Sequence, residues 1–118
     1  MPLSNTALQT LYTALKGMGA YVSAHTDDPG TTGANEVSGG VYARVQATLP
    51  TGSNGAGTAP QVSIPIPAGT TVKYLGVWSA LTGGTFIGTH NSQLSPNLPF
   101  PVDGTLTAQI GEVITSTP

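Results

Sequence analysis

Apolar residues near the start of the chain recur every three or four positions, which is the spacing of one face of a helix. In the segment "LSNTALQTLYTALKGMG" this spacing relates Leu8, Leu11, Leu15 and Met18. The pattern predicts a helix over about residues 5–17, in which Thr6 and Gln9 fit a capping box and Ser4 or Asn5 is an alternative cap. The apolar stripe must be buried, either against one end or face of the sheet core or on a partner chain.

Beyond this helix, short segments alternate apolar and polar residues and predict strands between about residues 20 and 116. The segment "VYARVQATL", residues 41–49, alternates throughout. The segment "TVKYLGVWSA" is apolar on both faces from Tyr74 onward, so we expect it at the centre of a sheet. "QVSIPIP" contains Pro65, which has no N–H to donate, so this strand is expected at a sheet edge. The "LTGG" turn predicts a hairpin into "TFIGTHN".

Two segments interrupt the alternation. "PTGSNGAGTAP", residues 50–60, is rich in Gly, Ser and Asn and is interpreted as a flexible or contact loop. "LSPNLPFPVDG", residues 94–104, holds three prolines and is expected to be an extended cover rather than a central strand. The chain, residues 1–118, is therefore predicted to be one domain with a mainly β fold, an antiparallel, jelly-roll-like β-sandwich with one N-terminal α-helix.

Charge is sparse, because acidic and basic residues make up 7% of the chain, against roughly a quarter of an ordinary domain. The basic residues Lys16, Arg44 and Lys73 are far apart in sequence, so we expect no basic patch and no nucleic acid as a partner. No run approaches the ~20 apolar residues of a membrane span. No secretory signal is visible, and the absence of cysteine excludes disulfides and thiolate metal sites. We expect a protein made in a cytoplasm, without membrane contact.

One stretch concentrates the candidate chemistry: "HTDDPGTTGANEVSGGVYAR", residues 25–44. It fails as a calcium loop, because an EF-hand counted from Asp27 has Pro29 at its third position and no Gly at its sixth. A zinc site would require folding to bring His25 and His90 together with further ligands. We predict no metal site and no cofactor.

Catalytic signatures are missing as well. The chain has no G-x-S-x-G elbow and no Gly-rich phosphate loop followed by Lys and Ser or Thr. Asp27 and Asp28 are adjacent, so on extended backbone their carboxylates point in opposite directions instead of pairing for sugar hydrolysis. We predict no catalytic residues and no enzyme activity.

The same stretch is better explained as a structural loop. "DDPG" is a turn in which Asp28 accepts from the backbone ahead, Pro29 presets φ and Gly30 permits a positive φ. Arg44 is expected to pair with one loop carboxylate, from Asp27, Asp28 or Glu36. The residues predicted to shape and hold the loop are Asp28, Pro29, Gly30, Gly33, Asn35, Glu36, Gly39, Gly40 and Arg44.

Possible contact residues are expected on the strands and loops around it. Tyr42 is the aromatic residue expected to be exposed, because its strand neighbours on that face are polar. The edge strand, the middle loop and the proline-rich cover supply the others, so the possible contact surface is Tyr42, Asn54, Pro65 and Phe100. His25, at a strand end, is expected to be an ordinary hydrogen-bonded residue.

Three parts of the sequence resemble a family of small virion proteins from tailed bacteriophages and prophages. They are the "DPG…TGANEV.GG.YAR" signature, "IPAGTTVKYLGVWSALTGGTFIGT" and "GTLTAQIGEVIT", which together cover most of residues 8–115. Members are described as tail-fibre, minor-tail or head-decoration proteins. The resemblance therefore implies a place in a virion assembled in the host bacterial cytoplasm, and it brings no catalytic or ligand residues.

Two functions are compatible with that resemblance. The first is a capsid decoration protein that binds the outside of the head through the major capsid protein and stabilises coat contacts, since the chain is short for a fibre with both an anchor and a tip. The alternative is a minor tail or tail-fibre-associated protein that binds other tail proteins and contacts host surface glycans. In either case we expect a homo-oligomer, and the resemblance suggests a homotrimer.

Overall fold

The computed structural model describes residues 3–90, 98–109 and 111–113. This part of the chain holds one helix and ten strands, in the order α1 (Asn5–Gly17), β1 (Tyr21–His25), β2 (Val45–Gln46), β3 (Ala56–Thr58), β4 (Val62–Ile66), β5 (Thr70–Val72), β6 (Tyr74–Trp78), β7 (Phe86–His90), β8 (Leu98–Phe100), β9 (Gly104–Ala108) and β10 (Gly111–Val113). The helix begins and ends where the sequence predicts.

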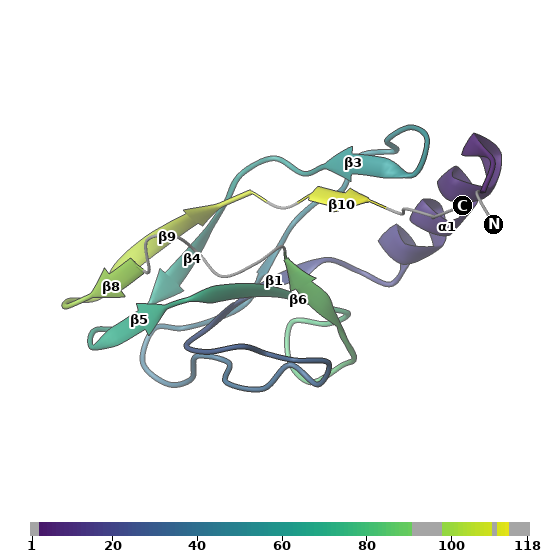
Figure 1. The fold of residues 1–118 in the computed structure, drawn as a ribbon. Coiled ribbons are helices and arrows are strands. Elements are labelled where there is room, and N and C mark those ends of the chain that lie inside the picture. The colour runs from purple at the N-terminus through teal and green to yellow at the C-terminus, as the bar shows by residue number, and fades with distance from the viewer. Residues whose placement is uncertain (1–2, 91–97, 110, 114–118) are drawn as a thin grey trace.

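The strands pair antiparallel. β1 and β6 lie at the centre of a four-stranded sheet in the order β2–β1–β6–β7, and the remaining strands form the ribbons β4–β9, β5–β8 and β3–β10. In Figure 1 the β4–β9 ribbon lies over this sheet, so the body is a small sandwich. The mainly β, antiparallel fold with one N-terminal helix is confirmed, and so is the central position predicted for the strand that contains Tyr74.

The apolar core fills the space between the four-stranded sheet and the β4–β9 ribbon. Val22 of β1 and Ile64 and Ile66 of β4 have no exposed surface. Burial of each such side chain contributes about 1.5–3 kcal/mol relative to an exposed one. Within the described residues β4 pairs with β9 alone, which places Pro65 at a sheet edge as the sequence predicts.

The other face of β1 is polar but equally buried. Alternate residues of a strand point to opposite faces, so Ser23 and His25 lie on the side away from Val22, and both are 0% exposed. Residues 26–44 cover this face, and in Figure 1 they pass beneath β1 and β6, on the side away from β4 and β9. The body therefore has three layers, which are the ribbon, the sheet and this covering loop.

α1 lies at one end of an elongated molecule with extents of 47 × 24 × 22 Å (Figure 1). Ser4 is its N-cap, with Oγ accepting from the Ala7 N–H at 3.2 Å, so of the predicted caps Ser4 is correct and Thr6 is not. Tyr12 is 0% exposed, and its hydroxyl donates to the Pro50 carbonyl at 2.9 Å. The helix is thus held at the end of the sandwich and does not pack across the sheet.

The strand predicted over residues 41–49 is wrong for its first half. Within that range Val45–Gln46 forms β2, and Val41 is 47% exposed. Before β2 the residues expected on the polar face point inward. Tyr42 and Arg44 do so because both bind the carboxylate of Glu36 in the loop beneath them. An apolar–polar alternation does not reveal an attraction of these side chains to the Glu36 carboxylate.

The interpretation of residues 50–60 as a flexible connection is also wrong, since this segment contains β3. Ser53 and Ala56 exchange two backbone hydrogen bonds of 3.0 Å around the turn. Asn54 and Gly55 between them have φ values of 52° and 85°. Two central residues with positive φ mark a tight hairpin turn of the type that Asn-Gly favours. The Asn-Gly dipeptide in the sequence therefore indicates this turn.

The long strand predicted around Tyr74 is divided at Lys73. β5 pairs with β8, whereas β6 pairs with β1 and β7, and the Lys73 N–H donates to the His25 carbonyl at 2.9 Å at the point of division. Part of the proline-rich segment, residues 94–97, lies outside the described residues. Its remainder includes β8, which has β5 as its partner there and is not a central strand.

We expect Gly76→Ala to lower the free energy of unfolding by about 1–3 kcal/mol, as overpacking of a filled interior does. A Cβ at Gly76 would lie 2.7 Å from His25 Nε2 and 2.8 Å from Ser23 Oγ. Gly88→Ala on neighbouring β7 is the control, because a Cβ there meets none of the described atoms within 4 Å. Urea unfolding measures both variants, and equal stabilities would contradict this close packing.

Candidate functional site

The covering loop is closed by its own turn residues. Asp28 Oδ1 accepts from the Gly30 N–H at 2.9 Å, and Gly30 has a φ of 60°. Pro29 is buried, and its carbonyl accepts from the Gly33 N–H at 3.0 Å. Asn35, with a φ of 62°, donates Nδ2 to the Asp28 carbonyl at 3.0 Å. The loop therefore satisfies its backbone locally, with Gly and Asn where left-handed backbone is needed.

Gly33 brings the loop into direct contact with the sheet. Its φ is 78°, and a Cβ built on it would overlap the indole ring of Trp78 and lie 2.8 Å from Phe86 Cδ1. The Trp78 and Phe86 rings meet edge to face with their centroids 5.1 Å apart. Both the backbone conformation and the lack of space make glycine the residue that fits here.

Arg44 is held by hydrogen bonds from three of its nitrogen atoms. Nε and Nη2 donate to the two carboxylate oxygens of Glu36 at 2.8 and 2.9 Å. Nη1 donates to the carbonyls of Ala80 and Gly83 at 3.0 and 2.8 Å. The guanidinium carbon lies 3.9 Å from the Trp78 ring centroid. Of the three carboxylates that the sequence offers, the one paired with Arg44 belongs to Glu36, and their side chains are 9% and 19% exposed.

Tyr42 completes this group and is not the exposed aromatic residue that the sequence predicts. Its hydroxyl donates to Glu36 Oε2 at 2.7 Å and accepts from the Ala24 N–H at 3.2 Å. Burial and the bond to Glu36 raise the pKa of Tyr42 above its ordinary value. Burial alone would raise the pKa of Glu36, but the hydrogen bonds from Arg44 and Tyr42 hold it below its ordinary value. We term Glu36, Tyr42, Arg44 and Trp78 the Arg44 cluster.

A chain of hydrogen bonds runs beneath the loop. Trp78 Nε1 donates to Ser23 Oγ at 3.2 Å, Ser23 Oγ lies 2.7 Å from His25 Nε2, and His25 Nδ1 lies 2.9 Å from the Ala34 carbonyl. Because a carbonyl can only accept, we assign the imidazole proton to Nδ1, so that Nε2 accepts from the Ser23 hydroxyl. Burial lowers the pKa of His25, which is consistent with a neutral imidazole.

The Ser23–His25 pair has the distance of a hydrolytic dyad but lacks its access. Both side chains are 0% exposed, and the third partner is a backbone carbonyl. A nucleophile must reach its substrate, so this arrangement serves to bind the loop to the sheet. Across residues 3–90, 98–109 and 111–113, no three His, Asp or Glu side chains are grouped so that they could hold a metal ion.

Three members of the Arg44 cluster, Glu36, Tyr42 and Arg44, also line a surface hollow of about 400 Å³. Ser38, Gly39 and the 53% exposed Leu81 line the same hollow. Gly39 and the adjacent Gly40 bend the chain with φ values of 83° and 57°, and a Cβ at Gly40 would lie 2.9 Å from Pro67 Cβ. The residues predicted to shape and hold the loop thus lie together in the covering loop and its attachment to the sheet.

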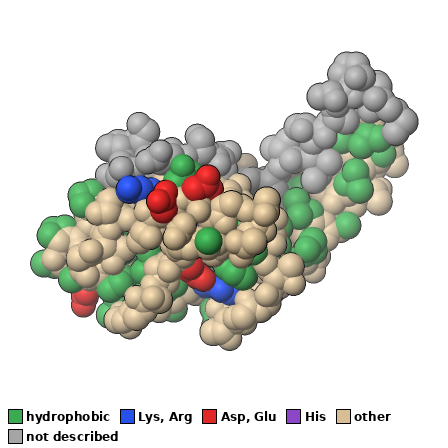
Figure 2. All heavy atoms as spheres, turned by 60° about the horizontal axis from the view of Figure 1, so that its bottom comes forward, with side chains coloured by type: hydrophobic (Ala, Val, Ile, Leu, Met, Phe, Trp, Pro, Cys, Tyr) green, Lys and Arg blue, Asp and Glu red, His purple; other side chains and the backbone are tan. Residues whose placement is uncertain are grey.

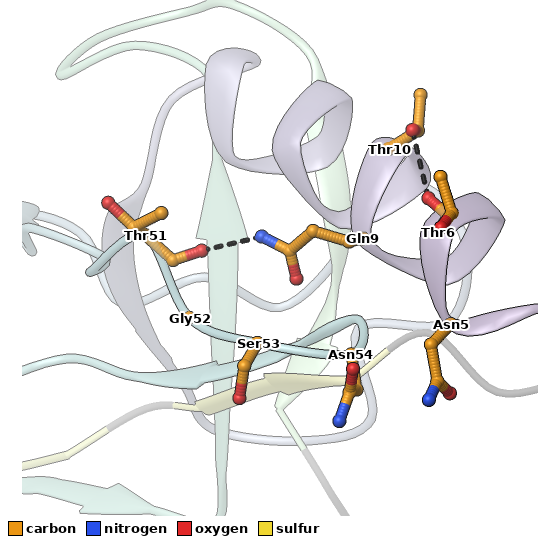
Figure 3. A pocket seen from close by; sticks show the side chains of 8 residues that line it. All are labelled: Asn5, Thr6, Gln9, Thr10, Thr51, Gly52, Ser53 and Asn54. Atoms are coloured by element: carbon orange, nitrogen blue, oxygen red, sulfur yellow. Dashed lines mark hydrogen bonds between the residues drawn. The ribbon is translucent and has the colours of Figure 1, made fainter.

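A second hollow, of about 500 Å³, lies between α1 and the turn before β3 (Figure 3). Gln9 crosses it, with Nε2 donating to the Thr51 carbonyl at 2.9 Å and Oε1 accepting from the Gly55 N–H at 3.0 Å. The capping-box assignment of Gln9 therefore missed its role as the link between helix and turn. Amide, hydroxyl and backbone groups line the hollow, from Asn5, Thr6, Gln9, Thr10, Thr51, Gly52, Ser53 and Asn54.

The four predicted contact residues do not share one surface. Asn54 lies beside α1, whereas Phe100 belongs to β8 near the opposite end of the molecule (Figure 1). Pro65 lies on β4, and Tyr42 is enclosed in the Arg44 cluster. A single partner surface built from all four residues is not supported.

Few charged side chains lie on the face turned forward in Figure 2, which consists mostly of uncharged polar groups and backbone. This agrees with the net charge of −2 and the 7% of charged residues. Within the part of the chain that the structure describes, no helix is long and apolar enough to cross a membrane.

The sequence was compared with models of protein families and with curated proteins. The model of a family described as podophage GP4 fiber I protein gp80 matches residues 3–115 of the chain, which include α1, the covering loop and the sheet. A search of curated proteins gave no match.

We expect Arg44→Lys to lower the free energy of unfolding by about 2–4 kcal/mol, because an ammonium group cannot replace the bidentate bond to Glu36 and the stacking on Trp78. Lys73→Gln removes a positive charge outside the cluster and is expected to change stability by about 0.5 kcal/mol or less. Denaturant unfolding followed by the fluorescence of Trp78, the single tryptophan, measures both. Equal losses in the two variants would show that the cluster does not hold the loop.

Stability is expected to fall as the pH drops below about 6.5, the ordinary pKa of histidine. The pKa of His25 is lowered in the folded protein, so between that value and about 6.5 the unfolded chain binds more protons and acid favours unfolding. The lowered pKa of Glu36 acts in the same direction at more acid pH, since its contribution is lost as the pH falls through the folded value.

Denaturant unfolding across this pH range tests the assignment to His25. His25→Gln does not titrate there, so its stability should depend less on pH than that of the unmodified protein, although it starts lower. Imidazole nitrogen shifts measured by NMR should also show the Nδ1–H tautomer in the folded protein. The same slope in both proteins between about pH 6.5 and pH 5 would assign the acid sensitivity to another group.

Proposed function

The chain belongs to the podophage GP4 fiber I protein gp80 family, and from this premise we propose that it is a non-enzymatic structural protein associated with a fibre of the virion. The observation that carries the proposal is the family match, which extends over residues 3–115. Membership identifies a bacteriophage structural protein. Its partners are then neighbouring fibre or tail proteins of the same particle.

The structure supports such a role through its shape and its fixed loop. The molecule is elongated, with extents of 47 × 24 × 22 Å, and its covering loop is bound to the sheet by the Arg44 cluster. The Ser23–His25 pair beneath the loop is buried, so it offers no reactive group to a substrate. These features suit a component that must present a constant surface to its neighbours.

Capsid decoration, the first function predicted from the sequence, has less support than the fibre alternative. The family description names a fibre. The short length of the chain, in contrast, favours a decoration protein on the head. A fibre built from several polypeptides does not need an anchor and a tip in each of them. The length of the chain is therefore compatible with the fibre role.

Direct contact with host glycans has limited structural support. Sugar binding commonly uses exposed aromatic rings, but Trp78 lies beneath Arg44 and Tyr42 is bonded to Glu36. Among the described residues every aromatic side chain is buried or half-buried. The amides and hydroxyls around the hollow in Figure 3 are groups of the kind that form hydrogen bonds with sugars.

Fractionation of the virion tests the fibre assignment. Purified particles are separated into heads and tails with fibres, and this protein is quantified in each fraction by mass spectrometry against the major coat protein. We expect it to follow the fibres in a copy number far below that of the coat protein. Recovery in fibre-free heads, in numbers comparable to the coat protein, would support decoration instead.

A further inference from the structure

One strip along α1 lies on a different side of the helix from the residues that bind the described part of the body. Successive helix positions are turned by about 100°, so Ala7, Leu11, Ala14 and Met18 lie within about 60° of one another. Leu11 and Met18 are each 47% exposed, Ala14 is exposed and Ala7 is half-buried. These four residues, of which Met18 is the C-cap that follows the helix, form the α1 strip. An apolar strip along one side of a helix is a candidate for a surface that a partner covers.

The body of the protein occupies a different side of the helix. Gln9, which binds the turn before β3, is turned by about 160° from Leu11 around the helix axis. Tyr12, whose hydroxyl is bonded to Pro50, is turned by about 100° from Leu11. Within the described residues, these hydrogen bonds to the body therefore do not involve the α1 strip.

The α1 strip is complementary to itself when two helices run antiparallel. Small and large residues alternate along it, with the four-three-four spacing of a coiled-coil seam. About a twofold axis between positions 12 and 13, Leu11 faces Ala14 of the second copy, and Met18 faces Ala7. Each large side chain then meets a small one, which allows the helices to approach closely. In a parallel pair, by contrast, Leu11 would face Leu11 and Ala7 would face Ala7.

Charge does not oppose this arrangement. Lys16 is the charged residue of α1, and it is turned by about 140° from Leu11, away from the strip. The strip therefore offers apolar surface and no charge for a charged partner to recognise. We propose that this protein associates with a second copy of itself through antiparallel packing of the two α1 strips, an isologous twofold contact.

The contact is expected to be weak on its own. A 13-residue helix is about 20 Å long, and a pair of this length buries less than the ~1,600 Å² of a standard interface. Association is therefore reversible in dilute solution, and in a particle with several copies it is strengthened by multivalency. The pairing does not depend on which part of the virion holds the protein, so a failure of the fibre assignment would leave it standing.

Sedimentation equilibrium at protein concentrations up to about 1 mM, where a millimolar Kd still populates the complex, tests the association. The mass should rise from the 11.8 kDa of one chain toward twice that value. Leu11→Glu should remain monomeric over the whole range, whereas Thr13→Glu, on the far side of the same helix, should associate like the unmodified protein. A monomer at every concentration, a trimer, or equal association of Leu11→Glu would overturn the proposal. Circular dichroism confirms that each variant is folded.

Cysteine pairs test the direction of the helices, because the chain has no cysteine of its own. The double variant Ala7→Cys/Met18→Cys should form a covalent dimer under mild oxidation, since each Cys faces its partner position across the axis. Met18→Cys alone should not, because its two copies would lie about 16 Å apart along the axis, beyond the reach of a disulfide. A covalent dimer of the single variant that is as abundant as that of the double variant would mean parallel helices and would overturn the antiparallel arrangement.

Discussion

The bidentate pair between Arg44 and Glu36 is the interaction on which the covering loop depends. Two charges that are largely removed from water are tolerated when their remaining hydrogen-bonding groups are satisfied. Arg44 meets this condition through Glu36 and the carbonyls of Ala80 and Gly83, and Glu36 meets it through Arg44 and Tyr42. One guanidinium group therefore fixes the positions of the loop, the approach to β2 and the hairpin after β6 relative to one another.

The pair has this importance because the central sheet needs a cover on both faces. Apolar residues of the β4–β9 ribbon cover one face, as in an ordinary sandwich. The other face carries Ser23 and His25, and it is covered by a loop, an element that usually lies at the surface. The loop can take this place because its turns satisfy its own backbone and because Gly33 allows it to lie against Trp78. Polar contacts, together with the packing of Gly33 against Trp78 and Phe86, thus hold this layer, whereas apolar packing holds the other.

Local patterns made part of this structure predictable. The helix, the edge position of β4 and the turn at Asp28 depend on residue types and spacing within a few residues, and the structure has each of them. The inward direction of Tyr42 was not predictable, because an attraction to Glu36 across the loop overrides the alternation of the chain. β3 was missed for another reason, since the glycines around Asn54 suggested flexibility and hid a hairpin turn. The place on the particle depends on neighbours that the fold of one chain does not reveal.

The inward position of Arg44 and Glu36 has a consequence for how this protein meets its neighbours. The whole chain has eight charged residues, three basic and five acidic. Two of them, Arg44 and Glu36, pair with each other inside the fold. Contacts that the remaining surface makes through shape, hydrogen bonds and apolar area are screened very little by dissolved ions. A particle assembled at the ionic strength of a cell and then released into far more dilute water would keep these contacts at nearly the same strength.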